Sequence, residues 1–93
     1  MTGQTMRRRV VVSGRVQGVG FRWNARSRAA ELGLTGWVRN LPDRRVEIYF
    51  QGENGAVEEM EDWCRLGPQF SRVSGFSVTD EAPLEYEEGF EIR

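Results

Sequence analysis

The sequence contains neither histidine nor lysine among its 93 residues, and its one cysteine is Cys64. The chain therefore lacks a histidine base or metal ligand, a lysine that could form a Schiff base, and the lysine of a P-loop. A single cysteine can form no internal disulfide and cannot alone build a cysteine metal cage. These absences exclude most of the side-chain chemistry that hydrolases and metalloenzymes use.

Long apolar runs are also missing. The longest run near the N-terminus is the valine stretch 10–12, which is too short for a secretion signal or a membrane span. A chain of this kind with one cysteine is expected to be cytoplasmic and to have no membrane partner. Hydrophobic residues make up 39% and charged residues 29% of the chain, a balance typical of a folded globular protein rather than a disordered one.

The length of the chain leaves room for one hydrophobic core. No internal repeat, low-complexity tract or linker interrupts the sequence. We therefore expect a single domain over residues 1–93, in which residues 1–6 form a loose N-terminal tail.

The thirteen basic residues are all arginines, and they are unevenly distributed. Residues 1–45 hold ten arginines against two acids, a net charge of +8, whereas residues 46–93 have a net charge of −9. This asymmetry favours an anionic partner for the first half. The alternative is that the two halves interleave in one sheet and their charges pair. We expect such pairing for Arg7, Arg8, Arg9, Arg44 and Arg45.

Hydrophobic periodicity predicts two helices and five strands. The helices are expected at 22–32 and 55–66, the second with Asn54 as its N-cap. Gly75 is expected to mark a β-bulge. The strands are expected at 7–13, 35–41, 45–51, 73–79 and 90–92.

The order β-α-β-β-α-β contains two split βαβ units, so the first and second strands should be parallel. One sheet can then pack both helices on a single face. The pattern predicts an α/β (α+β) sandwich of the ferredoxin-like βαββαβ type. It has one mostly antiparallel sheet, two helices on one face and a short extra C-terminal strand.

A glycine-rich segment, residues 13–22, joins the first strand to the start of the first helix. Glycines let successive N–H groups turn inward and the helix dipole adds positive potential, so this segment suits a phosphate-sized anion. It is not a Walker loop, which would need Lys followed by Ser or Thr where Arg22-Trp23 stands. It is not a dinucleotide fingerprint either, because Trp23 occupies the position of the third glycine.

Two motifs resemble the signatures of the small bacterial-type acylphosphatase family. The first is Gly-Arg-Val-Gln-Gly-Val-Gly-Phe-Arg over residues 14–22, and the second is Gly-Trp-Val-Arg-Asn over residues 36–40. One departure from the family is Arg44, which follows Asp43 where glycine is common, and it leaves the type of turn open. Further similar pairs, which extend the resemblance across nearly the whole chain, are Val46-Glu47, Gln51-Gly52 and Gly67-Pro68.

The resemblance implies a role for each motif. Arg22, which ends the first, would bind the substrate phosphate, and Asn40, which ends the second, would orient the attacking water. Because the first two strands are expected to be parallel, both residues should lie at the same edge of the sheet. The resemblance implies no metal and no cofactor. Backbone amides of the loop would complete the phosphate cradle, contributed by Arg15, Val16, Gln17, Gly18, Val19, Gly20 and Phe21.

These groups suit an activated phosphate. An acyl phosphate expels a carboxylate that is stable near neutral pH, so its leaving group needs no general acid, and positioning and charge neutralisation remain. The expected function is hydrolysis of the carboxyl–phosphate bond to a carboxylate and inorganic phosphate, without metal or covalent intermediate. The expected partner is a small-molecule acyl phosphate, with inorganic phosphate or sulfate as competing anion. We expect a monomer that binds no nucleic acid.

Three alternatives stay open. The fold and the basic first half allow an RNA- or protein-binding module, although no aromatic stacking pair is evident on the central strands. The second is a carbamoyl-phosphate-handling relative of the domain in hydrogenase-maturation carbamoyltransferases, which belong to much longer chains. The third is an inactive copy used for assembly, against which the intact Arg22 and Asn40 argue.

The other polar and aromatic residues have structural explanations. Arg15 and Arg39 are expected to be surface or strand-face charges. For Gln17, ordering the loop through its side-chain amide and having no specific role stay equally open. Serine catalysis lacks a histidine partner. Packing rather than chemistry is expected of Trp23, Trp37, Trp63 and Cys64.

Overall fold

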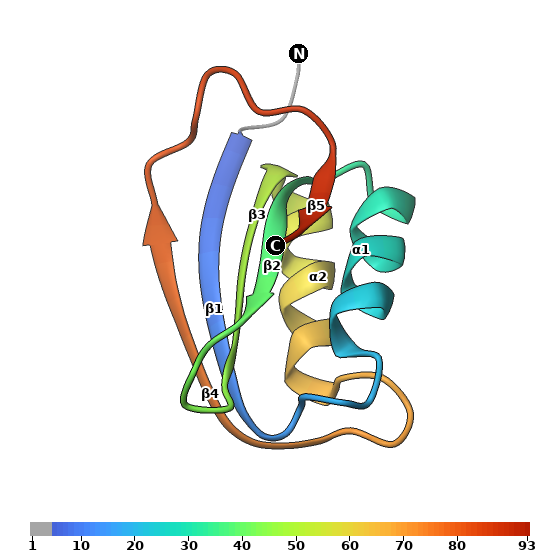
Figure 1. The fold of residues 1–93 in the computed structure, drawn as a ribbon. Coiled ribbons are helices and arrows are strands. Elements are labelled where there is room, and N and C mark those ends of the chain that lie inside the picture. The colour runs from blue at the N-terminus through green and yellow to red at the C-terminus, as the bar shows by residue number, and fades with distance from the viewer. Residues whose placement is uncertain (1–4) are drawn as a thin grey trace.

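The computed structural model describes residues 5–93 as one five-stranded sheet with both helices packed on the same face (Figure 1). The architecture confirms the ferredoxin-like βαββαβ sandwich with an extra C-terminal strand. In chain order, the elements are β1 (Thr5–Arg15), α1 (Phe21–Glu31), β2 (Thr35–Asn40), β3 (Val46–Glu53), α2 (Asn54–Leu66), β4 (Arg72–Glu81) and β5 (Phe90–Ile92).

The strands lie in the order β4-β1-β3-β2-β5. β3 pairs antiparallel with both β1 and β2, so those two strands run parallel to each other although they are not neighbours. β4 pairs antiparallel with β1, while β5 pairs parallel with β2. The carboxyl ends of β1 and β2 therefore share one edge of the sheet, as the sequence predicts.

The hydrophobic core lies between the sheet and the two helices. Alternate residues of each strand point to opposite faces, so Val10 and Val12 enter this core. Each fully buried side chain of this size contributes about 1.5–3 kcal/mol. The predicted apolar stripes of the helices are confirmed, since both are fully buried at their core positions: Phe21, Ala25 and Ala29 on α1 and Val57, Met60 and Cys64 on α2.

The opposite face of the sheet carries a charge network. Glu47 of β3, only 5% exposed, accepts hydrogen bonds from Arg9 of β1 at 2.6 Å and from Arg39 of β2 at 2.7 Å. Burial raises the pKa of the Glu47 carboxyl, but the two guanidinium hydrogen bonds outweigh that effect and hold the pKa below its usual value. On the helix side, Arg8 pairs with Glu61 at 2.7 Å. Acids of the second half thus neutralise much of the basic first half.

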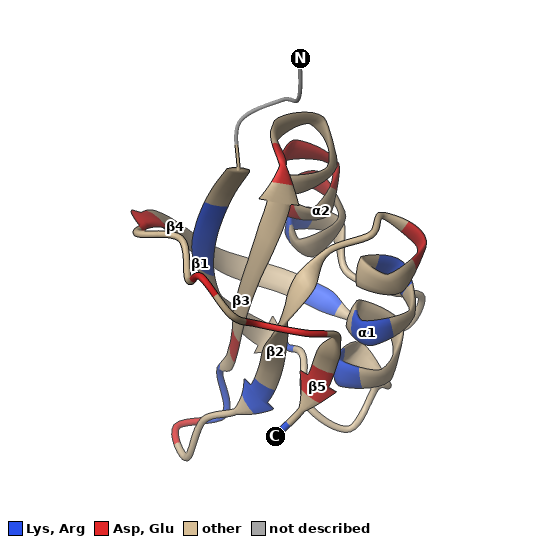
Figure 2. Ribbon diagram, turned by 90° about the horizontal axis from the view of Figure 1, so that it is seen from above, with Lys and Arg blue, Asp and Glu red and all other residues tan. Residues whose placement is uncertain are grey.

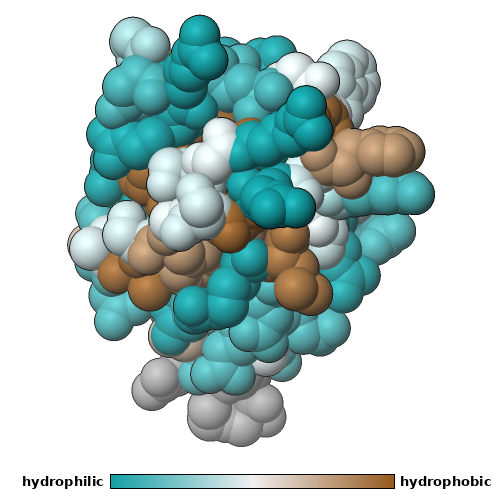
Figure 3. All heavy atoms as spheres, turned by 90° about the horizontal axis from the view of Figure 1, so that it is seen from below, coloured by the Kyte–Doolittle hydropathy of each residue, from teal (hydrophilic) through white to brown (hydrophobic). Residues whose placement is uncertain are grey.

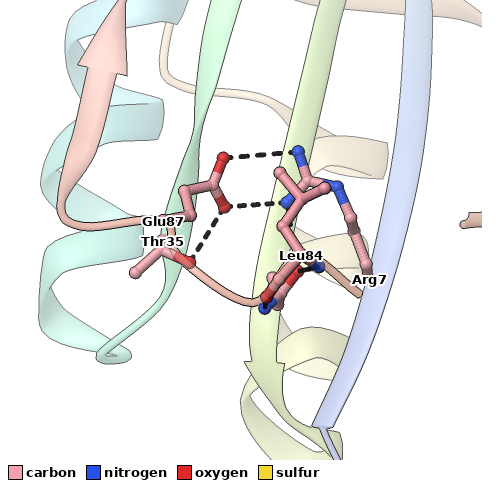
Figure 4. Close-up of polar contacts among 5 residues, drawn as sticks. Arg7, Thr35, Leu84 and Glu87 are labelled. Carbon is pink, nitrogen blue, oxygen red and sulfur yellow. Dashed lines mark hydrogen bonds and ion pairs between the residues drawn. The ribbon is translucent and has the colours of Figure 1, made fainter. Parts of the chain in front are cut away.

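A strap, residues 82–89, connects β4 to β5 across the sheet at the end where β1 and β2 begin (Figures 1 and 2). Glu87 of the strap accepts hydrogen bonds from Arg7 at 2.7 Å and from the Thr35 hydroxyl at 3.0 Å. The side-chain amide of Gln51 bonds the backbone N–H and C=O of Leu84, at 2.8 and 2.9 Å (Figure 4). The strap is therefore fixed to three strands at once.

Three local predictions differ from the structure. β1 begins at Thr5, so the end of the expected N-terminal tail is strand, while residues 1–4 of that tail lie outside the described residues. The N-cap of α2 is Glu53 rather than Asn54, because the Glu53 carboxylate accepts a hydrogen bond from the N–H of Gly55 at 3.2 Å. The bulge predicted at Gly75 falls at the residue before it, Ser74, which the β1–β4 register skips.

The helices found in residues 5–93 are too short or too polar to cross a membrane.

Candidate active site

The loop between β1 and α1 is the centre of the candidate site. Gly18 has φ 75° and Gly20 has φ 79°, left-handed conformations that a side chain would strain. Gly20 is also the N-cap of α1, where it provides no side-chain acceptor, and the first turn of the helix holds no acid. The electropositive helix start therefore has neither a capping side chain nor a carboxylate, which suits an anion in the loop.

Arg22 lies in the first turn of α1, directly after this loop, and is partly buried. Among the described residues no carboxylate lies within 4 Å of its guanidinium, in contrast to Arg8 and Arg9. A guanidinium without an internal partner keeps its planar set of donors for a phosphate.

Asn40 lies at the last position of β2, at the same edge of the sheet. Its register partner in β3 is Val46, and Val46 is also the register partner of Val12 in β1. Asn40 and Val12 therefore flank one residue, two strand spacings of about 4.8 Å apart. β1 continues past Val12 to Arg15, and the glycine loop follows it. The topology thus brings the loop and Asn40 to one edge, as the sequence predicts.

Gln17 joins the loop to the β2–β3 connection. Its side-chain amide donates to the carbonyl oxygens of Leu41 and Arg45, both at 3.0 Å. Leu41 is the residue after Asn40, so this side chain fixes the loop against the hairpin that follows Asn40. Of the two roles left open for Gln17, the structure shows the ordering one.

The hairpin turn keeps its shape without the expected glycine. The N–H of Arg44 donates to the carbonyl of Leu41 at 3.1 Å, and Arg44 has φ 75°. A four-residue turn with proline second and a left-handed residue in its fourth position matches a common three-residue hairpin with a bulge. Asp43 accepts from the N–H of Arg45 at 3.2 Å and from its guanidinium at 2.7 Å, which helps to hold the turn.

A hollow of about 580 Å³ lies beside the loop. Seen from below, this end of the molecule mixes strongly hydrophilic side chains with apolar surface (Figure 3). Arg22 and Asn40 do not line the hollow, so it adjoins the predicted catalytic pair rather than containing it. Its lining residues are Gly14, Arg15, Val16, Gln17 and Arg44.

The pairing of the two halves expected for the arginines is confirmed at three of five positions. Arg7, Arg8 and Arg9 each pair with a carboxylate of the second half, whereas Arg45 pairs with Asp43 of its own half. Arg44 has no carboxylate partner within residues 5–93, so the prediction of pairing was wrong there. Arg44 lines the hollow, and the nearby Asp43 carboxylate pairs with Arg45 instead. Arg39 is a strand-face charge, as expected, since it pairs with Glu47.

Cysteine and the tryptophans have mostly structural roles. Burial raises the pKa of the Cys64 thiol, which lies in the core as predicted. Trp63 packs on Phe21, but Trp23 is 60% exposed, with the Arg26 guanidinium 4.3 Å from its ring centre, so its predicted packing role was wrong. In the part of the chain that the structure describes, no cluster of three or more acidic or cysteine side chains could hold a metal ion.

An aromatic pair on the open face was missed. Trp37 of β2 and Tyr49 of β3 are cross-strand partners whose ring centres lie 4.6 Å apart. The pair was not foreseen because register between β2 and β3 cannot be read from either strand alone. Arg7 and Arg93 lie over the two rings, which the network of that face holds in place.

Known proteins resemble this chain in sequence and in fold. A family model described as acylphosphatase matches residues 8–92. An acylphosphatase of Rubrobacter xylanophilus is 57% identical over 90 residues, which cover 97% of this chain and 82% of that protein. The crystal structure of acylphosphatase from Bacillus subtilis superposes with a TM-score of 0.90 at 40% identity, covering 95% of this chain and 98% of that one. Full-length HypF, in its phosphate- and nucleotide-bound form, matches with a TM-score of 0.88 at 26% identity, covering all of this chain but 12% of that one.

Proposed function

The chain belongs to the acylphosphatase family and acts as an acylphosphatase on a small-molecule acyl phosphate; we propose that the glycine loop, Arg22 and Asn40 carry out this hydrolysis. The observation that supports this assignment most directly is the shared register partner of Val12 and Asn40. It holds the end of β2 beside the loop that precedes Arg22. The alternative of an RNA-binding module is less well supported, because the family model that matches residues 8–92 is that of acylphosphatases.

In the proposed mechanism the loop binds the phosphoryl group. The N–H groups of residues 15–21 surround its oxygens, and the uncapped start of α1 adds positive potential. The Arg22 guanidinium donates two hydrogen bonds to the equatorial oxygens, where negative charge collects in the transition state. This binding holds the phosphorus with the acyl oxygen pointing out of the loop.

Asn40 aligns the attacking water opposite the leaving acyl oxygen. Its amide oxygen accepts a hydrogen bond from the water and orients it without removing the proton, and a phosphate oxygen of the substrate takes that proton up. The water oxygen forms a bond to phosphorus as the P–O bond to the acyl oxygen breaks, so that inorganic phosphate forms and a carboxylate leaves. Because that carboxylate is stable near neutral pH, the reaction needs neither a general acid nor a covalent intermediate.

The test is the variant Asn40→Ala with benzoyl phosphate as substrate. We expect kcat to fall by about 10²–10³-fold, since a single preorganised polar group is lost. The inhibition constant of Asn40→Ala for inorganic phosphate should stay within about threefold of the parent value, because the loop and Arg22 still bind phosphate. Arg22→Ala should lower kcat and also weaken phosphate inhibition. Near-normal turnover by Asn40→Ala would refute the assignment, and so would loss of phosphate inhibition in that variant.

Two controls accompany this test. Asn54→Ala removes an equivalent amide at the start of α2, and its kcat should match that of the parent. The parent enzyme should hydrolyse benzoyl phosphate in excess chelator and leave p-nitrophenyl phosphate intact, because p-nitrophenolate is more basic than a carboxylate and therefore a poorer leaving group for a site that has no general acid. Strict dependence on added Mg²⁺ would contradict a metal-free reaction.

The proposal includes the setting of the enzyme. Residues 1–93 would form one domain that acts as a monomer in the cytoplasm, without a cofactor. Inorganic phosphate and sulfate would compete with the substrate for the loop, because both present tetrahedral oxygens to the same N–H groups. Sedimentation tests the monomeric state, and competition assays with phosphate and sulfate test anion binding to the loop.

A further inference from the structure

Most arginines of this chain are neutralised by a carboxylate, and a few are not. Eight arginines pair with a carboxylate within 4 Å, for example Arg7 with Glu87 and Arg28 with Glu31. Across residues 5–93 the arginines without such a carboxylate are Arg15, Arg22, Arg26, Arg44 and Arg72. Arg22 is accounted for by phosphate binding, and Arg26 stacks on Trp23.

The other three gather beside the phosphate loop. Arg15 and Arg72 are direct register partners of β1 and β4, an arrangement of like charges that destabilises a sheet. Arg15 and Arg44 line the same hollow of about 580 Å³. Three positive charges thus lie together without a compensating acid, in a chain whose net charge is −1. All three are exposed, so this end of the protein presents an uncompensated positive surface that suits an anionic ligand.

The hollow and the phosphate cradle share a wall. Val16 and Gln17 line the hollow, and their N–H groups belong to the proposed cradle. Gln17 also bonds the hairpin that carries Arg44, which fixes that hairpin against the loop. A substrate whose phosphoryl group occupies the cradle can therefore extend its acyl half into a hollow bordered by Arg15 and Arg44.

We propose that this basic hollow is a subsite for a second negative charge, so that the enzyme prefers acyl phosphates whose acyl half carries a carboxylate or a phosphate. The inference rests on the proposed function, because it takes the loop as the phosphoryl site. Arg44 is the residue that determines this preference. It occupies a left-handed position where glycine would be unstrained, and its guanidinium has no other partner among the described side chains.

The experiment compares two substrates that differ by one charge, benzoyl phosphate and 4-carboxybenzoyl phosphate, at low ionic strength. We measure the ratio of their kcat/KM values. For the parent enzyme the carboxylated substrate should be favoured by about fivefold, the upper range of one solvent-exposed ion pair. The preference should appear in KM rather than in kcat and should shrink at 0.5 M salt, because exposed charges are screened.

Variants assign the preference to Arg44. Arg44→Gly suits the left-handed conformation, so folding is not at risk, and it should bring the ratio close to one. Arg44→Glu should invert the ratio in favour of benzoyl phosphate. Arg65→Ala makes the same change in net charge on α2, where Arg65 pairs with Glu61, and should leave the ratio as in the parent.

The outcomes separate the two proposals. If neither substrate is hydrolysed, the proposed function fails. If both are hydrolysed with a ratio near one in the parent, or if Arg44→Gly keeps the parental ratio, the subsite is refuted while the proposed function stands. If the ratio falls equally in Arg65→Ala, the preference comes from overall charge, which also refutes the subsite.

Discussion

The two ends of the sheet treat their arginines in opposite ways. At the end where β1 and β2 begin, Arg7 is 5% exposed and pairs with Glu87 of the strap, itself 13% exposed. At the end where they finish, Arg15, Arg44 and Arg72 have no carboxylate partner within residues 5–93. The first end pairs its buried arginine internally, whereas the second pairs Arg45 with Asp43 but leaves these three arginines without a carboxylate. With the proposed site at the second end, stability and binding would depend on separate ends of the same strands.

The contrast extends to hydrogen bonding. Near the strap, Gln51 uses its amide to hold a crossing segment in place, through Leu84. Near the glycine loop, Gln17 uses the same group to hold two functional segments in register, through Leu41 and Arg45. The first contact is expected to affect unfolding and the second to affect turnover. Substitutions at the two ends therefore test whether stability and turnover depend on separate parts of the sheet.

The largest effect is expected at the strap. Glu87→Ala leaves the buried Arg7 guanidinium without its carboxylate and should lower the free energy of unfolding by about 3 kcal/mol, as measured by urea denaturation. The kcat for benzoyl phosphate should remain within twofold of the parent, because the strap is at the far end from the loop. Glu88→Ala is the matched control, since Glu88 is exposed, and should change stability by less than about 0.5 kcal/mol. A Glu87→Ala enzyme that is stable but inactive would abolish the separation of the two ends.

A smaller effect is expected at Glu47, which joins Arg9 and Arg39 in the middle of the sheet. Glu47→Gln removes the charge but keeps the shape, and it should destabilise the protein by about 2 kcal/mol at pH 7, in the range of hydrogen bonds to charged groups. The pKa of Glu47 is lowered in the folded state, so its contribution is present above the ordinary glutamate value of about 4.3 and is lost as the pH falls through the folded value.

Thermal melts of parent and Glu47→Gln at several pH values check this sign. The stability gap between the two proteins should be constant from pH 7 to about 5 and should narrow as the pH falls below the ordinary glutamate pKa of about 4.3. A gap that widens in acid would mean that Glu47 is protonated in the folded protein, against the hydrogen bonds it accepts from two guanidinium groups.

The smallest effect is expected at Gln17. Gln17→Leu removes both hydrogen bonds to the hairpin, so the loop and Asn40 lose their fixed relative position, and kcat should fall about tenfold. Stability should fall by only about 1 kcal/mol, because the Leu41 and Arg45 carbonyls keep backbone partners. The control is Asn24→Ala, which loses a hydrogen bond to Gly20 within the loop's own helix and should retain most of its turnover. Equal losses in both variants would show that Gln17 acts on the loop alone.

The sequence predicted the fold and the placement of Arg22 and Asn40 because both depend on patterns along the chain. Alternating valines in β1, the glycine loop and the helical stripes of α1 and α2 can each be read locally, and topology then orients the strands. The alignment of Asn40 with Val12 results from the antiparallel pairing of β3 with both β1 and β2. Topology rules predict the direction of these strands but not which residues pair.

What the sequence could not provide depends on contacts between distant residues. Asn54 has the side chain favoured at an N-cap, but the chain leaves β3 so that Glu53 reaches the first free N–H instead. Arg44 was expected to find an acid because acids are abundant in the second half, yet the turn bonds Asp43 to Arg45. The two carbonyls that receive Gln17 are backbone groups, which no sequence pattern marks. In each of these cases the path of the backbone determines which groups come within hydrogen-bonding distance.

Val46, which stands between β1 and β2, has a consequence for how the enzyme acquires activity. The two strands that precede the proposed catalytic residues are not neighbours in the sheet, and both pair with the strand between them. During refolding, neither the β1–β3 nor the β2–β3 ladder alone can bring the loop and Asn40 together, so turnover should return only after both ladders have formed. The time course of regained turnover would therefore report a late step in assembly of the sheet. Burial of the core around Val10 and Ile48 can report earlier steps.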